Sequence, residues 1–243
     1  MNIVLKRVIK FFKFFKIPIQ KPLVLNIYPH HPPAFSQGLY YDGTFLYEST
    51  GLYGQSTLKK VDLSLKRIVK QIHLEEAFAE GIGCLNNRLV QLTWKAGTAY
   101  VYSMPDLISE GVLDYHGEGW GLTSKGDCFL MTDGSQHITY RDIDFQAIKS
   151  KKVTMNGIPL RWINDITFKK DSIYANVLYD NHIFEINEGS GKVLRVFDCT
   201  RLRDMAGQGH PEHVLNGIAY DGKSDTFFVT GKNWKYVFQV RLN

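Results

Sequence analysis

The sequence predicts an all-β protein, a five-bladed β-propeller with four antiparallel strands in each blade. The 243 residues are 44% apolar and 13% aromatic and include 21 glycines, a composition typical of many short strands joined by tight turns. A weak internal repeat occurs five times, with spacings of 43, 40, 44 and 52 residues. A sandwich or a barrel would not explain this regular period, whereas a propeller does.

The repeats share a start and an order of strands. Each begins with a polar or aromatic residue, then Gly or Asp, then Leu or Ile; the starts are Gln37-Gly38-Leu39, Glu80-Gly81-Ile82, Trp120-Gly121-Leu122, Asn164-Asp165-Ile166 and Asn216-Gly217-Ile218. A turn, an apolar strand, a loop and an alternating strand follow, and four of the five repeats continue to a further strand. A unit of roughly 40–45 residues with four strands is typical of a propeller blade.

The fifth repeat ends at Asn243 without an outer strand. The stretch LVLNIY at residues 23–28 has the pattern to supply it, which would join the two ends of the chain and remove an open sheet edge. We therefore expect a propeller domain at residues 22–243, preceded by a separate segment at residues 1–21.

Residues 1–21 carry six basic side chains and no acid, so subtracting six from the net charge of +5 leaves −1 for the rest. A body this close to neutral gives no indication of nucleic-acid binding. As a helix, the segment places Lys6, Lys10 and Lys13 on one face, opposite the apolar residues, which is typical of a helix on an anionic membrane surface. A degenerate signal peptide and a helix packed on the body are the alternatives. The sequence leaves open whether the protein is exported, to the periplasm or outside the cell, or membrane-associated.

We expect residues 1–17 to bind vesicles of anionic lipid, because this stretch has a charge of +5 and its helical faces separate. Co-sedimentation with anionic and with neutral liposomes measures the effect. Equal partition to both kinds of vesicle, or to neither, would contradict a membrane-surface helix.

Neither the cysteines nor the histidines are arranged for a metal or a disulfide framework. Cys84, Cys128 and Cys199 are widely spaced and odd in number, which favours buried free thiols. We expect no metal site and no cofactor. We expect the histidines of the two candidate clusters to lie on the surface: His30 and His31, and His210 and His213. Two aspartates at loop positions, Asp133 and Asp180, are expected to cap turns.

Strand direction predicts where polar residues gather. In a four-stranded meander, the loop entering the first strand and the loop between the second and third lie at the same end. The five repeat starts should therefore form one ring at the mouth of the central channel: Gln37, Glu80, Trp120, Asn164 and Asn216. The second set of loops adds Tyr53, Trp94, Lys95, Asp133, Asp180, Lys232 and Trp234.

Glu80 is the one acid among the five ring positions. In a dry, aromatic surrounding its pKa would be raised, so that it both takes and gives a proton near neutral pH. A structural hydrogen-bonding role explains the residue equally well at this point.

Every repeat carries a distinctive motif, and together the motifs cover the chain from about 28 to 240. They include FSQGL (35–39), YESTGLYGQS (47–56), QLTWK (91–95), GWGLT (119–123), LNGIAYD (215–221) and VTGK (229–232). These motifs resemble those of the plant-type glutaminyl-peptide cyclotransferases and their bacterial relatives. The resemblance implies a five-bladed propeller that cyclises an N-terminal glutamine of a peptide or protein to pyroglutamate and releases ammonia, without a metal. We expect the protein to be a monomer. The alternative is a propeller that only binds peptides or small molecules.

The resemblance also implies roles for individual residues. Glu80 would be the general acid/base and Lys232 an active-site lysine. The substrate would be bound by Phe35, Gln37, Trp94, Trp120, Asn164 and Asn216. Three positions depart from the family pattern: Leu178 replaces a tryptophan that would form a pocket wall, Asp165 replaces a glutamate, and Lys235 a proline.

Overall fold

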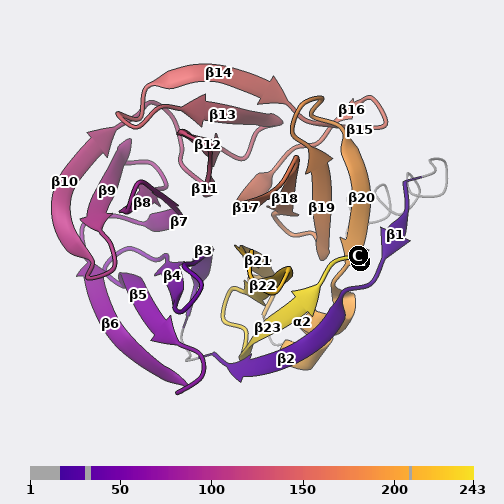
Figure 1. Cartoon of the computed structure of the whole chain (residues 1–243), viewed down its shortest axis with the longest axis horizontal. Helices are drawn as coiled ribbons and strands as arrows, with labels where there is room; N and C mark the ends of the chain where they lie inside the picture. The colour runs from indigo at the N-terminus through magenta and orange to yellow at the C-terminus, as the bar shows by residue number, and fades with distance from the viewer. Residues whose placement is uncertain (1–16, 31–33, 208–209) are drawn as a thin grey trace.

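Five antiparallel sheets surround a central axis, as the propeller prediction requires (Figure 1). The computed structural model describes residues 17–30, 34–207 and 210–243. Blade I contains β3 (Ser36–Tyr41), β4 (Leu46–Thr50), β5 (Ser56–Asp62) and β6 (Arg67–Leu74); blade II contains β7 (Ala79–Leu85), β8 (Arg88–Thr93), β9 (Thr98–Ser103) and β10 (Ile108–Asp114). Blade III contains β11 (Leu122–Lys125), β12 (Cys128–Thr132), β13 (His137–Arg141) and β14 (Ala147–Lys152).

The last two blades complete the circle. Blade IV contains β17 (Ile163–Lys169), β18 (Ser172–Val177), β19 (His182–Asn187) and β20 (Val193–Asp198); blade V contains β21 (Leu215–Asp221), β22 (Thr226–Gly231), β23 (Tyr236–Arg241) and β2 (Leu23–Pro29). β2 pairs antiparallel with β23, from Leu23 opposite Arg241 to Pro29 opposite Tyr236. The predicted closure by residues 23–28 is therefore confirmed, and it ties the two ends of the propeller together.

Four further elements among the described residues were not predicted. β1 (Ile19–Gln20) adds to the outer edge of blade IV, parallel to β20, and β15 (Thr154–Met155) and β16 (Ile158–Pro159) form a small hairpin. The helix α2 (Thr200–Ala206) joins blades IV and V, which accounts for the longest repeat spacing. The amphipathic helix predicted in residues 1–21 lies largely outside the described residues and stays a prediction. Over the described ranges, no helix has the length and apolar character needed to cross a membrane.

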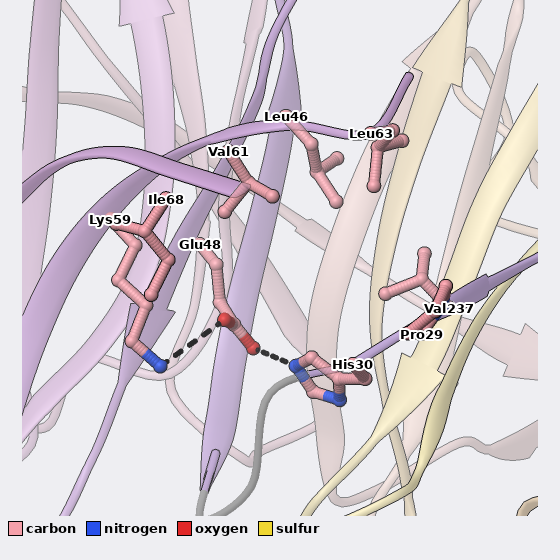
Figure 2. Close-up of a pocket in the computed structure, with 9 residues that line it drawn as sticks. All are labelled: Pro29, His30, Leu46, Glu48, Lys59, Val61, Leu63, Ile68 and Val237. Carbon is pink, nitrogen blue, oxygen red and sulfur yellow. Dashed lines mark hydrogen bonds and ion pairs between the residues drawn. The ribbon is translucent and has the colours of Figure 1, made fainter. Parts of the chain in front are cut away.

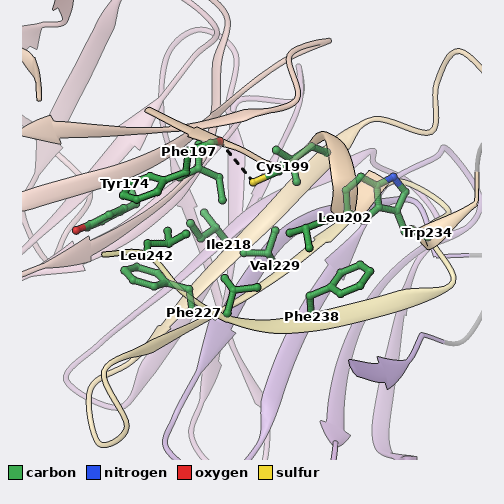
Figure 3. Close-up of a cluster of buried hydrophobic side chains, with 14 residues drawn as sticks. Tyr174, Phe197, Cys199, Leu202, Ile218, Phe227, Val229, Trp234, Phe238 and Leu242 are labelled. Carbon is green, nitrogen blue, oxygen red and sulfur yellow. Dashed lines mark hydrogen bonds between the residues drawn. The ribbon is translucent and has the colours of Figure 1, made fainter. Parts of the chain in front are cut away.

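The core lies between neighbouring blades, because each sheet buries both faces of its central strands. Between blades IV and V, Phe197 and Phe227 pack together with Trp234 and with Leu202 of α2 (Figure 3). Trp234 is fully buried, and its indole N–H donates to the carbonyl of His213 at 3.2 Å. Trp234 lies in the loop between β22 and β23, as predicted, but its side chain belongs to the core, where it packs on the backbone of Gly231.

His30 is also a correction, because it lies in the core and not on the surface. At 8% exposure, it sits at the end of β2, in the seam between blades V and I (Figure 2). Its Nε2 lies 2.6 Å from Oε1 of Glu48, and Nδ1 lies 2.8 Å from the carbonyl oxygen of Trp234. Lys59 Nζ lies 3.6 Å from the other oxygen of Glu48. A small cavity beside this cluster, of about 20 Å³, is lined mainly by apolar side chains.

All three cysteines are free thiols, as predicted, but only Cys199 is buried; Cys84 and Cys128 are half-buried. Asp133 and Asp180 cap turns, as expected: their Oδ1 atoms accept the backbone N–H of Ser135 at 3.0 Å and of His182 at 2.9 Å.

Candidate active site

Bulges at the start of the inner strands aim the predicted ring residues. The register of the first hairpin shifts between Ser36 and Gly38, between Ala79 and Ile82, between Ile163 and Ile166, and between Leu215 and Ile218. These shifts bracket Gln37, Glu80, Asn164 and Asn216. A bulge re-aims a side chain that would otherwise alternate with the strand. In four blades, therefore, the polar residue leaves the ladder at the same place.

The inner strands contact one another in a closed cycle, β3–β7–β11–β17–β21 and back to β3. Their approach is close enough to require glycine. A Cβ on Gly81 would lie 2.6 Å from Cα of Gly121, and a Cβ on Gly121 would lie 2.2 Å from the carbonyl oxygen of Asn164. The Glu-Gly and Trp-Gly pairs of the repeat are thus explained physically: glycine permits the approach, and the residue before it faces the mouth.

Glu80 is the central acid of this mouth. It is 6% exposed, and none of the residues that the structure describes donates a hydrogen bond to its carboxyl group. Burial raises its pKa well above 4.5; the positive charge of Lys232 opposes this, and the negative charges of Asp165 and Glu118 add to it. A buried carboxyl with free oxygens and a raised pKa is suited to proton transfer with a bound molecule.

Lys232 lies within electrostatic reach of Glu80 and is 7% exposed. Burial lowers its pKa, while the charges of Glu80 and Glu212 act in the opposite sense. Its Nζ lies 4.8 Å from the ring centroid of Phe35, within cation–π distance. The structure thus brings together Glu80, Lys232 and Phe35, which the sequence predicted for one site.

Asp165 is a buried acid whose place the sequence did not reveal. Its Oδ2 accepts the backbone N–H of Ile218 at 2.8 Å and of Leu39 at 3.2 Å, so it joins blade IV to blades V and I. Burial raises its pKa, and these backbone hydrogen bonds oppose the rise. Asp165 occupies the position that is glycine in the other four repeats. There it stabilises the ring, and its negative charge helps to raise the pKa of Glu80.

The ring amides are only partly satisfied. Asn216 Nδ2 donates to Oε1 of Gln37 at 3.0 Å and to the carbonyl of Ser36 at 3.0 Å. Gln37 Nε2, Asn164 Oδ1 and Asn216 Oδ1 are buried and have no hydrogen-bond partner in the described structure. Buried polar groups are nearly always paired, so a free donor and free acceptors at one mouth suit a small polar ligand or ordered water.

Aromatic side chains form the wall on the side of blades I to III. Glu118, which sequence reasoning missed, accepts the indole N–H of Trp94 at 2.8 Å and of Trp120 at 2.9 Å on the same Oε2 atom. Phe78 packs edge-to-face on Trp94, with centroids 5.6 Å apart, and contacts Phe35 at 6.3 Å. Glu118 lies two residues before Trp120, a predicted pocket tryptophan, and this spacing is the feature of the sequence that could have identified it.

Leu178, where the family resemblance implied tryptophan, is half-buried and follows β18. Its backbone N–H donates to the carbonyl of Trp162 at 2.9 Å. Trp162 and Tyr179 flank it and are paired edge-to-face, with centroids 6.4 Å apart. This chain therefore has aromatic rings beside that wall, although at different positions. Within the described ranges, no three His, Cys, Asp or Glu side chains gather as metal ligands.

Fold and site together define a class: a five-bladed propeller with a buried carboxyl group and a buried lysine in a polar and aromatic channel mouth. A family model described as glutamine cyclotransferase matches residues 9–242. Glutaminyl-peptide cyclotransferase of Arabidopsis thaliana is 34% identical over 225 residues, which are 90% of this chain and 70% of that protein. The crystal structure of Myxococcus xanthus glutaminyl cyclase superposes with a TM-score of 0.88 at 33% identity, covering 94% of this chain and 99% of that one. The chain belongs to the glutamine cyclotransferase family, and these likenesses support an enzyme of that type.

Proposed function

We propose that the protein cyclises N-terminal glutamine of peptides or proteins to pyroglutamate, with Glu80 as general acid and base. The observation that carries this proposal is the Glu80 carboxyl group, which is buried beside Lys232, has a raised pKa and is without a hydrogen-bond partner among the described residues. The names of the relatives in Arabidopsis and Myxococcus support the same reaction class.

The reaction needs one proton to be moved. The α-amine nitrogen of the glutamine attacks the carbon of its own side-chain amide, and a five-membered lactam forms as the C–N bond to the leaving nitrogen breaks. The amine loses a proton in this process, and the leaving nitrogen gains one to depart as ammonia. A single carboxyl group on one side of the substrate takes the first proton and gives it to the second nitrogen, and Glu80 has both oxygens free for this task.

Charge develops on the amide oxygen of the substrate in the tetrahedral state. Lys232 lies in the same mouth as Glu80 and is a donor suited to that oxygen. The unpartnered groups of Gln37 and Asn164 are a donor and an acceptor for the amide and the amine of the substrate. Phe35, Trp94 and Trp120 enclose the folded side chain and limit its conformations.

A direct test uses a short peptide that begins with glutamine. Mass spectrometry is expected to show loss of ammonia in the presence of the protein at a rate well above the spontaneous one. A matched peptide that begins with asparagine controls for general deamidation. If the glutaminyl peptide binds but its mass does not change faster than in buffer, the alternative of a non-catalytic binding module is supported.

We expect Glu118→Ala to raise KM by about tenfold, because the two indole rings lose the charge-assisted hydrogen bonds that hold them. Glu118→Gln keeps an acceptor oxygen and should change KM much less. Glu118→Gln also removes a negative charge that raises the pKa of Glu80. The acidic limb of the kcat/KM profile of this variant should therefore move to lower pH. Steady-state kinetics across pH check both variants; equal KM for the two would contradict the role given to these hydrogen bonds.

Leu178→Trp should tighten substrate binding with little change in kcat, since a ring at this half-buried position would stack on the glutamine side chain. Such a contact is worth roughly 0.5–1.5 kcal/mol, so KM should fall by up to about tenfold. Kinetics on one glutaminyl peptide with alanine at the second position decide the matter. An unchanged or higher KM, at equal thermal stability, would mean that other residues already form this wall.

A further inference from the structure

Two exposed aromatic rings lie beside the candidate site on the rim of blade IV. Trp162 directly precedes β17, whose start carries the ring residue Asn164, and Tyr179 lies in the loop between β18 and β19, at the same end. The two side chains are 48% and 49% exposed, although they contact each other edge-to-face. Large aromatic surfaces left half in water at the edge of a polar mouth are typical of a ligand contact.

The backbone holds both rings in this position. Trp162 has a φ of 64° and Tyr179 a φ of 63°, values in the left-handed region that bulky residues rarely adopt. The N–H of Trp162 donates to the carbonyl of Gly134 at 2.7 Å, and its own carbonyl accepts the N–H of Leu178 at 2.9 Å. An unfavourable conformation that is fixed by its surroundings often marks a functional position.

Glu212 connects Tyr179, which packs on Trp162, to the candidate site. Its Oε1 accepts the hydroxyl of Tyr179 at 3.0 Å, and its charge also acts on Lys232 in the mouth. In the described part of the chain, no lysine or arginine stacks on Trp162 or Tyr179. On the opposite rim, by contrast, Lys95 Nζ already lies 3.8 Å from the ring centroid of Trp94. The blade IV rim thus offers free ring faces next to a carboxylate.

We propose that Trp162, Tyr179 and Glu212 form a subsite for a basic side chain in the second or third residue of a glutaminyl peptide, a proposal that rests on the proposed function. With its first residue held at Glu80, the peptide must leave the mouth across the rim. An arginine or lysine there would meet the ring faces and the Glu212 carboxylate together. A glutamate in the same place would be repelled.

The test compares three peptide amides, Gln-Arg-Arg-Ala, Gln-Ala-Ala-Ala and Gln-Glu-Glu-Ala, at low ionic strength. With the full chain, KM for the arginine peptide is expected about tenfold below that for the alanine peptide, with similar kcat, and KM for the glutamate peptide is expected to be the highest. In Trp162→Ala and in Glu212→Gln, the arginine preference should fall to about twofold or less. Ile148→Ala, which removes an exposed apolar side chain from β14 of blade III, should keep the full preference.

Titration calorimetry of the same peptides separates this proposal from the proposed function. Turnover of all three peptides without an arginine preference, or with a preference that survives both variants, would overturn the subsite and leave the cyclisation intact. Tighter binding of the arginine peptide that both variants abolish, without turnover, would support the subsite and count against cyclisation. Neither turnover nor an arginine preference in binding would overturn both.

Discussion

Glu80→Gln is expected to lower kcat by at least about a hundredfold while the fold stays intact. Glutamine has nearly the same shape as glutamic acid but neither takes nor gives a proton, so the substitution removes general acid–base catalysis, which contributes roughly 10²–10⁴ in rate. KM should change less, because the aromatic and amide groups of the mouth remain. Wild-type turnover in this variant would assign the proton transfer to another group.

The pH profile gives an independent reading of the same assignment. Burial raises the pKa of Glu80 above 4.5, so the acidic limb of kcat/KM in the unmodified protein should lie above that of an ordinary glutamate. The residual activity of Glu80→Gln should lack this limb. Glu75→Gln is a matched control, because Glu75 is an exposed acid in the same loop region and no change is expected.

The fold was predictable because propeller architecture repeats, so five weak signals support one another. The glycines of the repeat have a physical reason in the structure: the inner strands come so close at Gly81 and Gly121 that a side chain there would clash, and the residue before each glycine faces the mouth. The closing strand was also predictable. The fifth repeat had no outer strand of its own, and residues 23–28 had a strand pattern but belonged to none of the five repeats.

What the sequence did not reveal depends on contacts between blades. Asp165 and Glu118 lie far apart in the chain, and only the closed ring brings their charges near Glu80. His30 looked like a surface residue because its partner, Glu48, lies on another blade, and Trp234 looked like a pocket residue because core and pocket tryptophans have the same local pattern. Local periodicity predicts which strands form, but not which polar groups meet across the seams.

The seam between the last and first blades leads to the second large expected effect, a loss of stability in His30→Gln. Burial alone would lower the pKa of His30, but the charge and the hydrogen bond of Glu48 outweigh it, so the pKa is raised. Burial alone would raise the pKa of Glu48, but His30, Lys59 and Ser36 lower it to about 2. The substitution leaves a buried carboxylate without its principal partner, which typically costs about 3–5 kcal/mol.

The sign of the pH dependence follows from the two shifts. Because the pKa of His30 is raised in the folded state, its stabilisation is fully present below 6.5 and is lost as the pH rises through the folded value. Because the pKa of Glu48 is lowered, its stabilisation is present above 4.5 and is lost as the pH falls towards 2. The difference in free energy of unfolding between the unmodified protein and His30→Gln should therefore be largest between pH 4.5 and 6.5.

Urea unfolding at pH 5.5, 7.5 and 9 measures this difference. The exposed His73 of β6 provides the control, because His73→Gln should shift stability little and without this pH window. Glu48→Gln and the double variant complete a cycle, in which the two losses should be far from additive because the residues share one hydrogen bond. Equal losses at all three pH values would show that His30 stabilises the seam by filling space, and that its charge has no part in holding the closing strand to blade I.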